Sequence, residues 1–230
     1  MSHPASELLL SFASGRADLT HRVILEAHLA GCPDCRAAVA ELAAPGAAFL
    51  RSFPDAPPPP ALWERLRDRI AEPAEQRQAP PPDLAGLPLP PAAVAELPAS
   101  RQRRPLRWHW GLARGARLAV LCRDPSTHSI LLVGHIPPRR AFPRHLHLGP
   151  EDVCVLTGAY ADEMGHYSAG EYAAYAPGTV HRPVVDAGET CWVLTRLEQP
   201  NLFFGWLGWA QRHFTRPTFF DGKEQRAPRA

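Results

Sequence analysis

Apolar residues recur at helical spacing through the first fifty residues of the chain. The recurring positions are Leu8, Leu9, Phe12, Val23, Ile24, Ala27, Leu29, Ala38, Val39 and Leu42. Breaks at Gly15 and Gly31 divide this pattern, which therefore predicts three short helices between Ser6 and Phe53. Because proline favours the first position of a helix, we expect the third helix to run from Pro33 to about Arg51, with Pro45 as a kink or an early end.

A second amphipathic pattern follows the proline run 57–60, which should be extended. Between Ala61 and Glu72, the side chains of Leu62, Trp63, Leu66 and Ile70 share one stripe, and Arg and Asp residues lie opposite. We expect a helix on a stiff spacer. Its stripe can fold back onto the N-terminal helices or bind a partner protein, and the pattern leaves both open.

The pattern changes to short strands after Leu106. The strand-like segments are Arg117–Cys122, Ser129–Ile136, Asp152–Leu156, Glu171–Tyr175 and Cys191–Leu197. No helical pattern separates them, which is typical of an antiparallel sandwich or barrel. The sequence therefore predicts an α+β protein of two domains, with a small N-terminal helical bundle and a C-terminal all-β domain.

Proline marks the expected division between the domains, because 14 of the 27 prolines fall between Pro54 and Pro105. We expect a helical domain over residues 1–78, a proline-rich linker over 79–105, a β domain over 106–215 and a tail over 216–230. Apolar residues within the linker, among them Leu84 and Leu97, indicate that it is partly anchored rather than free.

Charge and composition exclude several classes of protein. The 25 basic and 23 acidic residues give a net charge of +2, which disfavours nucleic acid as a direct partner. The longest apolar run, Leu202 to Ala210, is about half the length of a membrane span. The five cysteines are an odd number without dense spacing, so a secreted disulfide framework is disfavoured. We expect a cytoplasmic protein that does not bind membranes.

The first chemical constellation is His28-x3-Cys32-x2-Cys35, which joins the end of one predicted helix to the start of the next. Two thiolates at this spacing can bind one tetrahedral ion, and His28 lies one helical turn before Cys32. The pattern predicts a zinc site with His3 as the candidate fourth ligand, although a histidine near a terminus can also be mobile. A redox switch is the alternative, because oxidation of the cysteine pair would eject the metal.

The second constellation is His145-x-His147-x3-Glu151, with His181 further along the chain. His145 and His147 share one face of a strand, and Glu151 opens the next strand on the same face as Val153. A carboxylate directed into an apolar interior beside two imidazoles is costly without an ion. A three-histidine, one-glutamate set suits zinc, iron, manganese or nickel.

These spacings resemble the two-part metal motif of the cupin superfamily, whose fold is a double-stranded β-helix barrel. The chain departs from the motif at Arg139, where glycine is usual, and at Pro177, which comes one position late. Neither departure removes a ligand, but both affect the geometry of turns.

In this order, the two constellations resemble ChrR-type zinc-binding anti-sigma factors, in which a helical zinc-binding domain precedes a cupin domain. The resemblance implies that His3, His28, Cys32 and Cys35 bind Zn²⁺, and that His145, His147, Glu151 and His181 bind Zn²⁺ or another divalent transition metal. It also implies a cytoplasmic, non-enzymatic protein that inhibits an extracytoplasmic-function sigma factor. The cupin domain would sense oxidative stress such as singlet oxygen and release the sigma factor.

The alternative from another class is a cupin metalloenzyme, a dioxygenase or an isomerase, that carries an accessory zinc finger. Tyr160, Tyr167, Tyr175 and Trp192 could line a substrate pocket, although barrel core is the simpler interpretation of these side chains. Cys122, Cys154 and Cys191 lie in strand-like segments and are expected to be buried and inert.

Overall fold

A computed structural model describes residues 2–54, 57–71, 84, 86–102, 105–110 and 113–214. The predicted tail 216–230 lies outside these residues, as do residues 79–83, 85, 103 and 104 of the predicted linker. The helices are α1 (Ser6–Ala13), α2 (Leu19–Gly31), α3 (Pro33–Arg51), α4 (Leu62–Ala71), α6 (Pro91–Glu96), α7 (Ala99–Gln102) and α8 (Gly205–Phe214). The strands are β1 (Trp108–Trp110), β2 (Arg117–Arg123), β3 (Ile130–Ile136), β4 (His145–His147), β5 (Glu151–Thr157), β6 (Ala159–Ala161), β7 (His166–Ser168), β8 (Tyr172–Tyr175), β9 (Val180–His181), β10 (Val184–Val185), β11 (Cys191–Leu197) and β12 (Asn201–Phe203).

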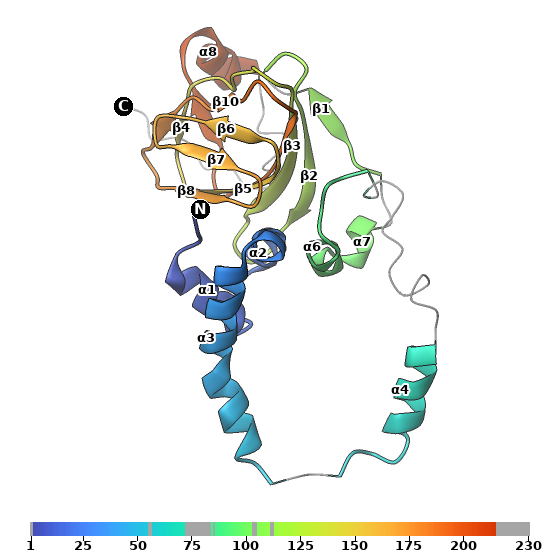
Figure 1. Cartoon of the computed structure of the whole chain (residues 1–230). Coiled ribbons are helices and arrows are strands. Elements are labelled where there is room, and N and C mark those ends of the chain that lie inside the picture. Colours follow the sequence, from blue (N-terminus) through green and yellow to red (C-terminus); the bar gives the residue numbers. More distant parts are fainter. Residues whose placement is uncertain are drawn as a thin grey trace.

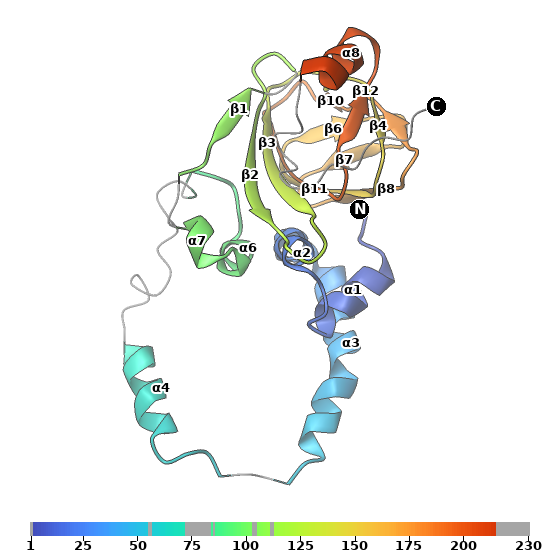
Figure 2. The same ribbon diagram turned by 180° about the vertical axis from the view of Figure 1, so that it is seen from behind.

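The three predicted N-terminal helices are confirmed as α1, α2 and α3. The side chain of Asp18 caps α2 by accepting a hydrogen bond from the backbone N–H of His21 at 2.9 Å. Pro33 occupies the start of α3, as predicted, and α3 continues through Pro45 to Arg51. The segment with Trp63 forms α4, which lies apart from the barrel in Figures 1 and 2.

The β domain is an antiparallel barrel built from three sheets. One sheet has six strands in the order β1-β2-β3-β11-β5-β8, and two sheets of three strands have the orders β10-β6-β7 and β12-β4-β9. The small sheets lie across one face of the large sheet (Figure 1). All five predicted strand segments are strands, and the α+β organisation of a helical region with a β domain is confirmed.

The large sheet is buried on both of its faces. On the barrel side, Val153 and Val193 pack with Tyr175 in one apolar cluster. On the other side, neighbouring positions such as Cys154 and Leu194 belong to a second cluster that also contains residues of α2. Three consecutive residues of α2, Val23 to Leu25, are completely buried. Helix α2 therefore packs on the outer face of the large sheet, and the linker is not the only connection between the helices and the barrel.

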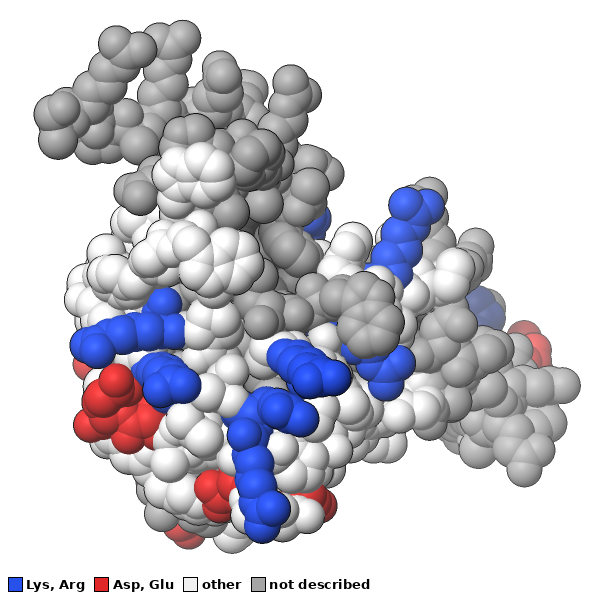
Figure 3. All heavy atoms as spheres, turned by 90° about the horizontal axis from the view of Figure 1, so that it is seen from above, with Lys and Arg blue, Asp and Glu red and all other residues white. Residues whose placement is uncertain are grey.

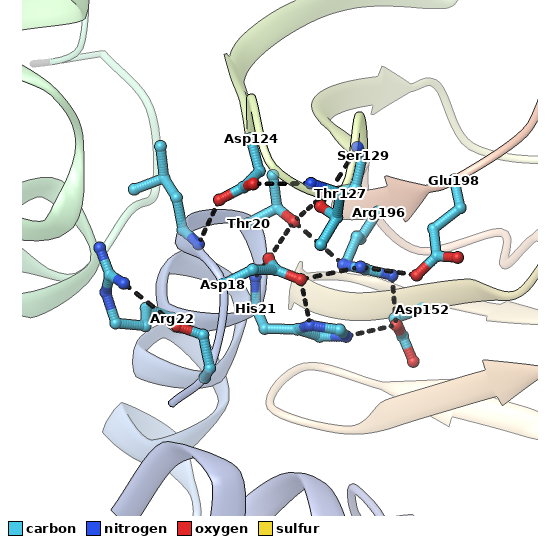
Figure 4. A network of polar contacts seen from close by, with 12 residues as sticks. Asp18, Thr20, His21, Arg22, Asp124, Thr127, Ser129, Asp152, Arg196 and Glu198 are labelled. Carbon is cyan, nitrogen blue, oxygen red and sulfur yellow. Dashed lines mark hydrogen bonds and ion pairs between the residues drawn. The ribbon is translucent and has the colours of Figure 1, made fainter. Parts of the chain in front are cut away.

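A polar network crosses the same interface (Figure 4). Arg196 of β11 is 1% exposed, and its guanidinium contacts Asp18 at 3.0 Å and Asp152 at 3.6 Å. His21 of α2 lies 2.8 Å from Asp18 and 3.4 Å from Asp152. A buried guanidinium needs charged partners and hydrogen bonds, and it obtains them from both the helices and the barrel.

Part of the predicted linker packs against α2, as expected from its apolar residues. Leu84, Ala93 and Leu97 are buried in the cluster that contains α2. The backbone after Leu84 forms α6, which packs against α2 (Figure 2). This segment therefore adds to the interface between the helices and the barrel.

On the face viewed from above, the Lys and Arg side chains of the described residues lie in small groups (Figure 3). Lys and Arg side chains on that face are interrupted by uncharged residues, and acidic side chains lie at its edge. This distribution agrees with the small net charge of +2. Within the described residues, the helices are too short or too polar to cross a membrane.

Candidate metal centres

The first candidate centre lies where the N-terminus, α2 and α3 meet. The structure brings together His3, His28 of the last turn of α2, Cys32 at the α2–α3 junction and Cys35 of the first turn of α3. One potential ligand atom from each residue lies within 4.8 Å of the others. The Nδ1 atom of His3 is 3.4 Å from the Cys32 sulfur and 3.3 Å from the Cys35 sulfur. His3, which lies far from the other three residues in the sequence, is therefore placed beside them.

The surroundings of this centre favour a bound cation. His28 donates a hydrogen bond from Nδ1 to the carbonyl of Gly170 at 2.8 Å, and its buried Nε2 has no partner among the described residues. Burial and the neighbouring Cys32 raise the pKa of the Cys35 thiol to about 11, so two adjacent thiolates are disfavoured without a positive ion. Two thiolates and two imidazoles are a common ligand set for tetrahedral zinc.

The second candidate centre lies inside the barrel. β4 supplies His145 and His147, β5 supplies Glu151 and β9 supplies His181, and all four side chains are at least 95% buried. The antiparallel pairing of β4 with β9 sets His145 opposite His181, with their Nε2 atoms 3.0 Å apart. One potential ligand atom of each of the four residues lies within 4.8 Å of the others. The four predicted residues are therefore brought to one point.

Hydrogen bonds behind the histidines set which ring nitrogen faces the centre. His145 donates from Nδ1 to the carbonyl of Pro143, and His181 donates from Nδ1 to the carboxylate of Asp162, both at 2.8 Å. These bonds leave each Nε2 lone pair free for a metal. Within the described part of the chain, neither ring nitrogen of His147 has a hydrogen-bond partner. A metal ion at this point would give a buried nitrogen of His147 a partner.

The protonation of the second centre also fits a cation. Burial lowers the pKa of His145 to about 4 and that of His147 to about 3. The neighbouring His181 adds to both shifts, whereas the hydrogen bond from His145 to the Pro143 carbonyl opposes the shift of His145. Burial raises the pKa of Glu151 to about 8. The donors are then neutral imidazoles around a carboxyl group that would ionise beside a positive ion. This donor set accepts zinc and several other divalent transition metals.

Two residues that support the second centre were not identified from the sequence. Asp162 lies between β6 and β7, and it also accepts a hydrogen bond from the hydroxyl of Tyr175 at 2.7 Å. Asn201 of β12 donates to the Glu151 carboxylate at 2.7 Å. Neither residue belongs to a regular spacing with the ligands. Their positions depend on the closure of the barrel, and no local pattern in the sequence encodes that closure.

Most of the aromatic and cysteine side chains of the predicted strands are buried, as expected for residues of the barrel core. Tyr160 and Tyr175 are buried, and their hydroxyl groups are 2.8 Å apart. The ring of Tyr175 is 4.4 Å from that of His181, so this core residue also borders the second centre. The remaining cysteines, Cys122, Cys154 and Cys191, are free thiols, and all three are buried.

The structure also explains one departure from the cupin motif. Arg139 occupies the position where glycine is usual, and it adopts a left-handed backbone with φ of 58°. Its N–H donates to the carbonyls of Val185 and Asp186, at 3.1 and 3.2 Å, which ties the turn to β10. The turn thus keeps a conformation that glycine adopts more easily.

Comparisons with known proteins agree with this architecture. The family model of the ChrR cupin-like domain matches residues 100–200. A zinc-finger family model matches residues 4–36, which include His28, Cys32 and Cys35. These matches confirm that the chain combines a zinc-finger region with a cupin domain.

Whole-chain comparisons extend the agreement. Anti-sigma-E factor ChrR of Cereibacter sphaeroides is 31% identical over 206 residues, which are 89% of this chain and 93% of that protein. A chain in the crystal structure of Rhodobacter sphaeroides SigE in complex with the anti-sigma ChrR is 25% identical. That match has a TM-score of 0.61 and covers 86% of this chain and 98% of the other. The match to an acetylacetone dioxygenase from Acinetobacter johnsonii covers 41% of this chain and 66% of that chain, at 20% identity. Its TM-score of 0.37 is too low to support an enzymatic function. By its sequence and its two-part architecture, this chain belongs to the ChrR family of anti-sigma factors.

Proposed function

We propose that this protein is a cytoplasmic anti-sigma factor that binds and inhibits an extracytoplasmic-function sigma factor. The main support is the similarity to anti-sigma-E factor ChrR, which covers 89% of the chain and therefore both the helical region and the barrel. The similar solved structure reported above is a chain in a complex of SigE with the anti-sigma ChrR. The proposal includes no enzymatic activity for the cupin domain.

Exposed apolar side chains mark the surface that would bind the sigma factor. On α4, Trp63 is 65% exposed, Leu66 is 39% exposed and Ile70 is 62% exposed, although the three share one helical face. At the end of α3, Phe49 and Leu50 are also exposed. The stripe of α4 is thus exposed and does not pack into the N-terminal bundle. Exposed apolar patches of this kind mark protein interaction sites, which favours the partner interpretation.

The first centre would hold Zn²⁺ and fix the geometry of the helices. Its candidate ligands join the N-terminal segment, the end of α2 and the start of α3. A bound ion would therefore connect three segments and add to the apolar packing of α3, in which Cys35 is buried and Val39 and Leu42 are partly buried against the core. In small zinc domains, the free energy of metal binding contributes directly to folding.

The second centre would hold Zn²⁺ or another divalent transition metal and would serve as the sensor of oxidative stress. Its candidate ligands come from β4, β5 and β9, which belong to two different sheets. A bound ion would supply positive charge to a buried carboxyl group and three imidazoles. Changes in the ligands would then alter the packing between the two sheets.

Binding can be tested by co-expressing the full chain with the extracytoplasmic-function sigma factor of its host. We expect the two proteins to co-purify and transcription from the sigma-dependent promoter to fall. Trp63→Ala combined with Leu66→Ala should weaken the complex by at least about tenfold, because both side chains would be buried in it. Asp68→Ala is the matched control, since Asp68 lies on the opposite face of α4. Wild-type affinity of the double variant would exclude α4 from the interface, and failure of the full chain to bind the sigma factor would refute the proposed function.

A further inference from the structure

The barrel contacts the first metal centre directly. The imidazole of His28 donates its Nδ1 hydrogen to the carbonyl of Gly170, 142 positions later in the chain, at 2.8 Å. Gly170 lies in the turn between β7 and β8, with a φ of +86° that favours glycine. The ring of His28 also packs edge-on against Tyr172 of β8, with centroids 5.7 Å apart. A residue of the barrel therefore fixes the tautomer and orientation of one candidate zinc ligand.

The same turn positions a second candidate ligand. The backbone N–H of Ser2 donates to one oxygen of the Glu171 carboxylate at 3.0 Å, and the Ser2 carbonyl accepts from the N–H of Tyr172 at 3.1 Å. The other oxygen of Glu171 accepts from the N–H of Ser168 at 2.8 Å, which holds the carboxylate in place. Ser2 directly precedes His3. The barrel thus holds the N-terminal segment so that His3 reaches the two cysteines.

The other end of α2 is fixed to the barrel by a separate contact. Asp18, the cap of α2, pairs with the buried Arg196 of β11 at 3.0 Å (Figure 4). Asp18 and His28 are ten positions apart on α2, which corresponds to about 15 Å along a helix. A change at Asp18 can therefore weaken docking of the barrel without touching the candidate zinc ligands.

We propose that the β7–β8 turn, residues 170–172, is part of the zinc site, so that zinc binding and docking of the barrel on α2 stabilise each other. The turn orients His28 and His3, two of the four candidate ligands, from a different domain. Groups that orient metal ligands contribute about 10- to 100-fold to metal affinity. This coupling is reciprocal: weaker packing of the barrel on α2 lowers the affinity for zinc, and loss of zinc weakens that packing. Glu171 acts here as a positioning residue.

Cobalt provides a test that reports only the first centre. Co²⁺ bound by Cys32 and Cys35 gives a thiolate-to-cobalt charge-transfer absorption, whereas the second centre contains no sulfur. The full chain is titrated with Co²⁺ and then with Zn²⁺ as the competitor, and the charge-transfer band is followed. Glu171→Ala removes the acceptor for Ser2. Asp18→Asn removes the charge that faces Arg196, but asparagine remains a good helix cap. Glu189→Ala, in the exposed loop before β11, is the matched control.

We expect Glu171→Ala to lower the affinity for both metals by about 10- to 100-fold. Glu171→Gln should recover part of this loss, because its amide oxygen can still accept from Ser2. Asp18→Asn should also lower the affinity, and Glu189→Ala should match wild type. Near-ultraviolet circular dichroism of the barrel tyrosines and tryptophans verifies that each variant is folded. Wild-type metal affinity in either Glu171→Ala or Asp18→Asn would overturn the proposal.

Discussion

Replacement of Asp162 by asparagine should weaken metal binding at the second centre without removing a candidate ligand. The side chain of Asp162 is completely buried. One carboxylate oxygen accepts from the backbone N–H groups of Met164 and Gly165, at 2.8 and 3.1 Å. The other accepts from His181 Nδ1 and from the hydroxyl of Tyr175. In Asp162→Asn, the two backbone donors require the amide oxygen, so the amide NH₂ group must face His181.

The size of the effect follows from this conflict between donors. His181 can keep its Nδ1 hydrogen and lose its partner, or it can move the hydrogen to Nε2, which then cannot bind a metal. Leaving a buried donor without its charged acceptor costs about 1.5–3 kcal/mol. At about 1.4 kcal/mol per tenfold change, this cost corresponds to a loss of roughly 10- to 100-fold in metal affinity.

The assay is the metal content of the full chain after equilibration with chelators of increasing strength, measured by mass spectrometry. Wild type is expected to hold two equivalents of metal, and Asp162→Asn should lose one of them to a weaker chelator. The thiolate charge-transfer band of the first centre should be unchanged. Asp186→Asn is the matched control, because Asp186 pairs with His166 at 2.8 Å on the surface. If Asp162→Asn retained the second equivalent as firmly as wild type, the orienting role of this carboxylate would be refuted.

Three further predictions address the two centres and the interface between helices and barrel. Cys35→Ala should lose zinc from the first centre and most inhibition of the sigma factor, and His3→Ala should lose less; full zinc content in Cys35→Ala would contradict the assignment. His147→Ala and Glu151→Ala should still bind the sigma factor but should not release it under oxidative stress in a promoter assay, and release equal to wild type would place the sensor elsewhere. His21 has a raised pKa: burial lowers it, and hydrogen bonds to nearby carboxylates outweigh that effect. The protonated form is therefore favoured in the folded state, and this stabilisation is lost as the pH rises above about 6.5 through the folded pKa. Thermal unfolding should show this loss in wild type but not in His21→Gln.

The candidate ligands could be predicted because their chemistry lies in short spacings. His145 and His147 share a face of one strand, and Cys32 and Cys35 share one helical turn, so local geometry alone places each pair together. His3 and His181 could be named only as candidates, to which the resemblance to a family added support, since no local pattern joins segments so far apart. Neither the local spacings nor the family resemblance predicts the residues that orient the ligands, such as Asp162.

The contact between helices and barrel was also missed, although the sequence contains part of the signal. A helix at the surface of a small bundle has one apolar stripe, whereas Val23, Ile24 and Leu25 are consecutive and therefore point in three directions. All three are completely buried, because α2 is covered by the barrel, by neighbouring helices and by α6. The proline-rich segment indicates two domains that are separate along the chain. Domains that are separate along the chain can still pack against each other.

This packing restricts how a sigma factor could bind. With α2 buried, most of the large apolar side chains that stay exposed in the described N-terminal region are at the end of α3 and on α4, where Phe49 and Trp63 are both 65% exposed. The C-terminal end of α3 and the whole of α4 lie away from the barrel in Figures 1 and 2. A partner that binds there would not have to displace the barrel from α2. The sigma factor would then contact α3 and α4, the barrel would contact α2, and a change in the barrel would reach the sigma factor through the first candidate centre and α3.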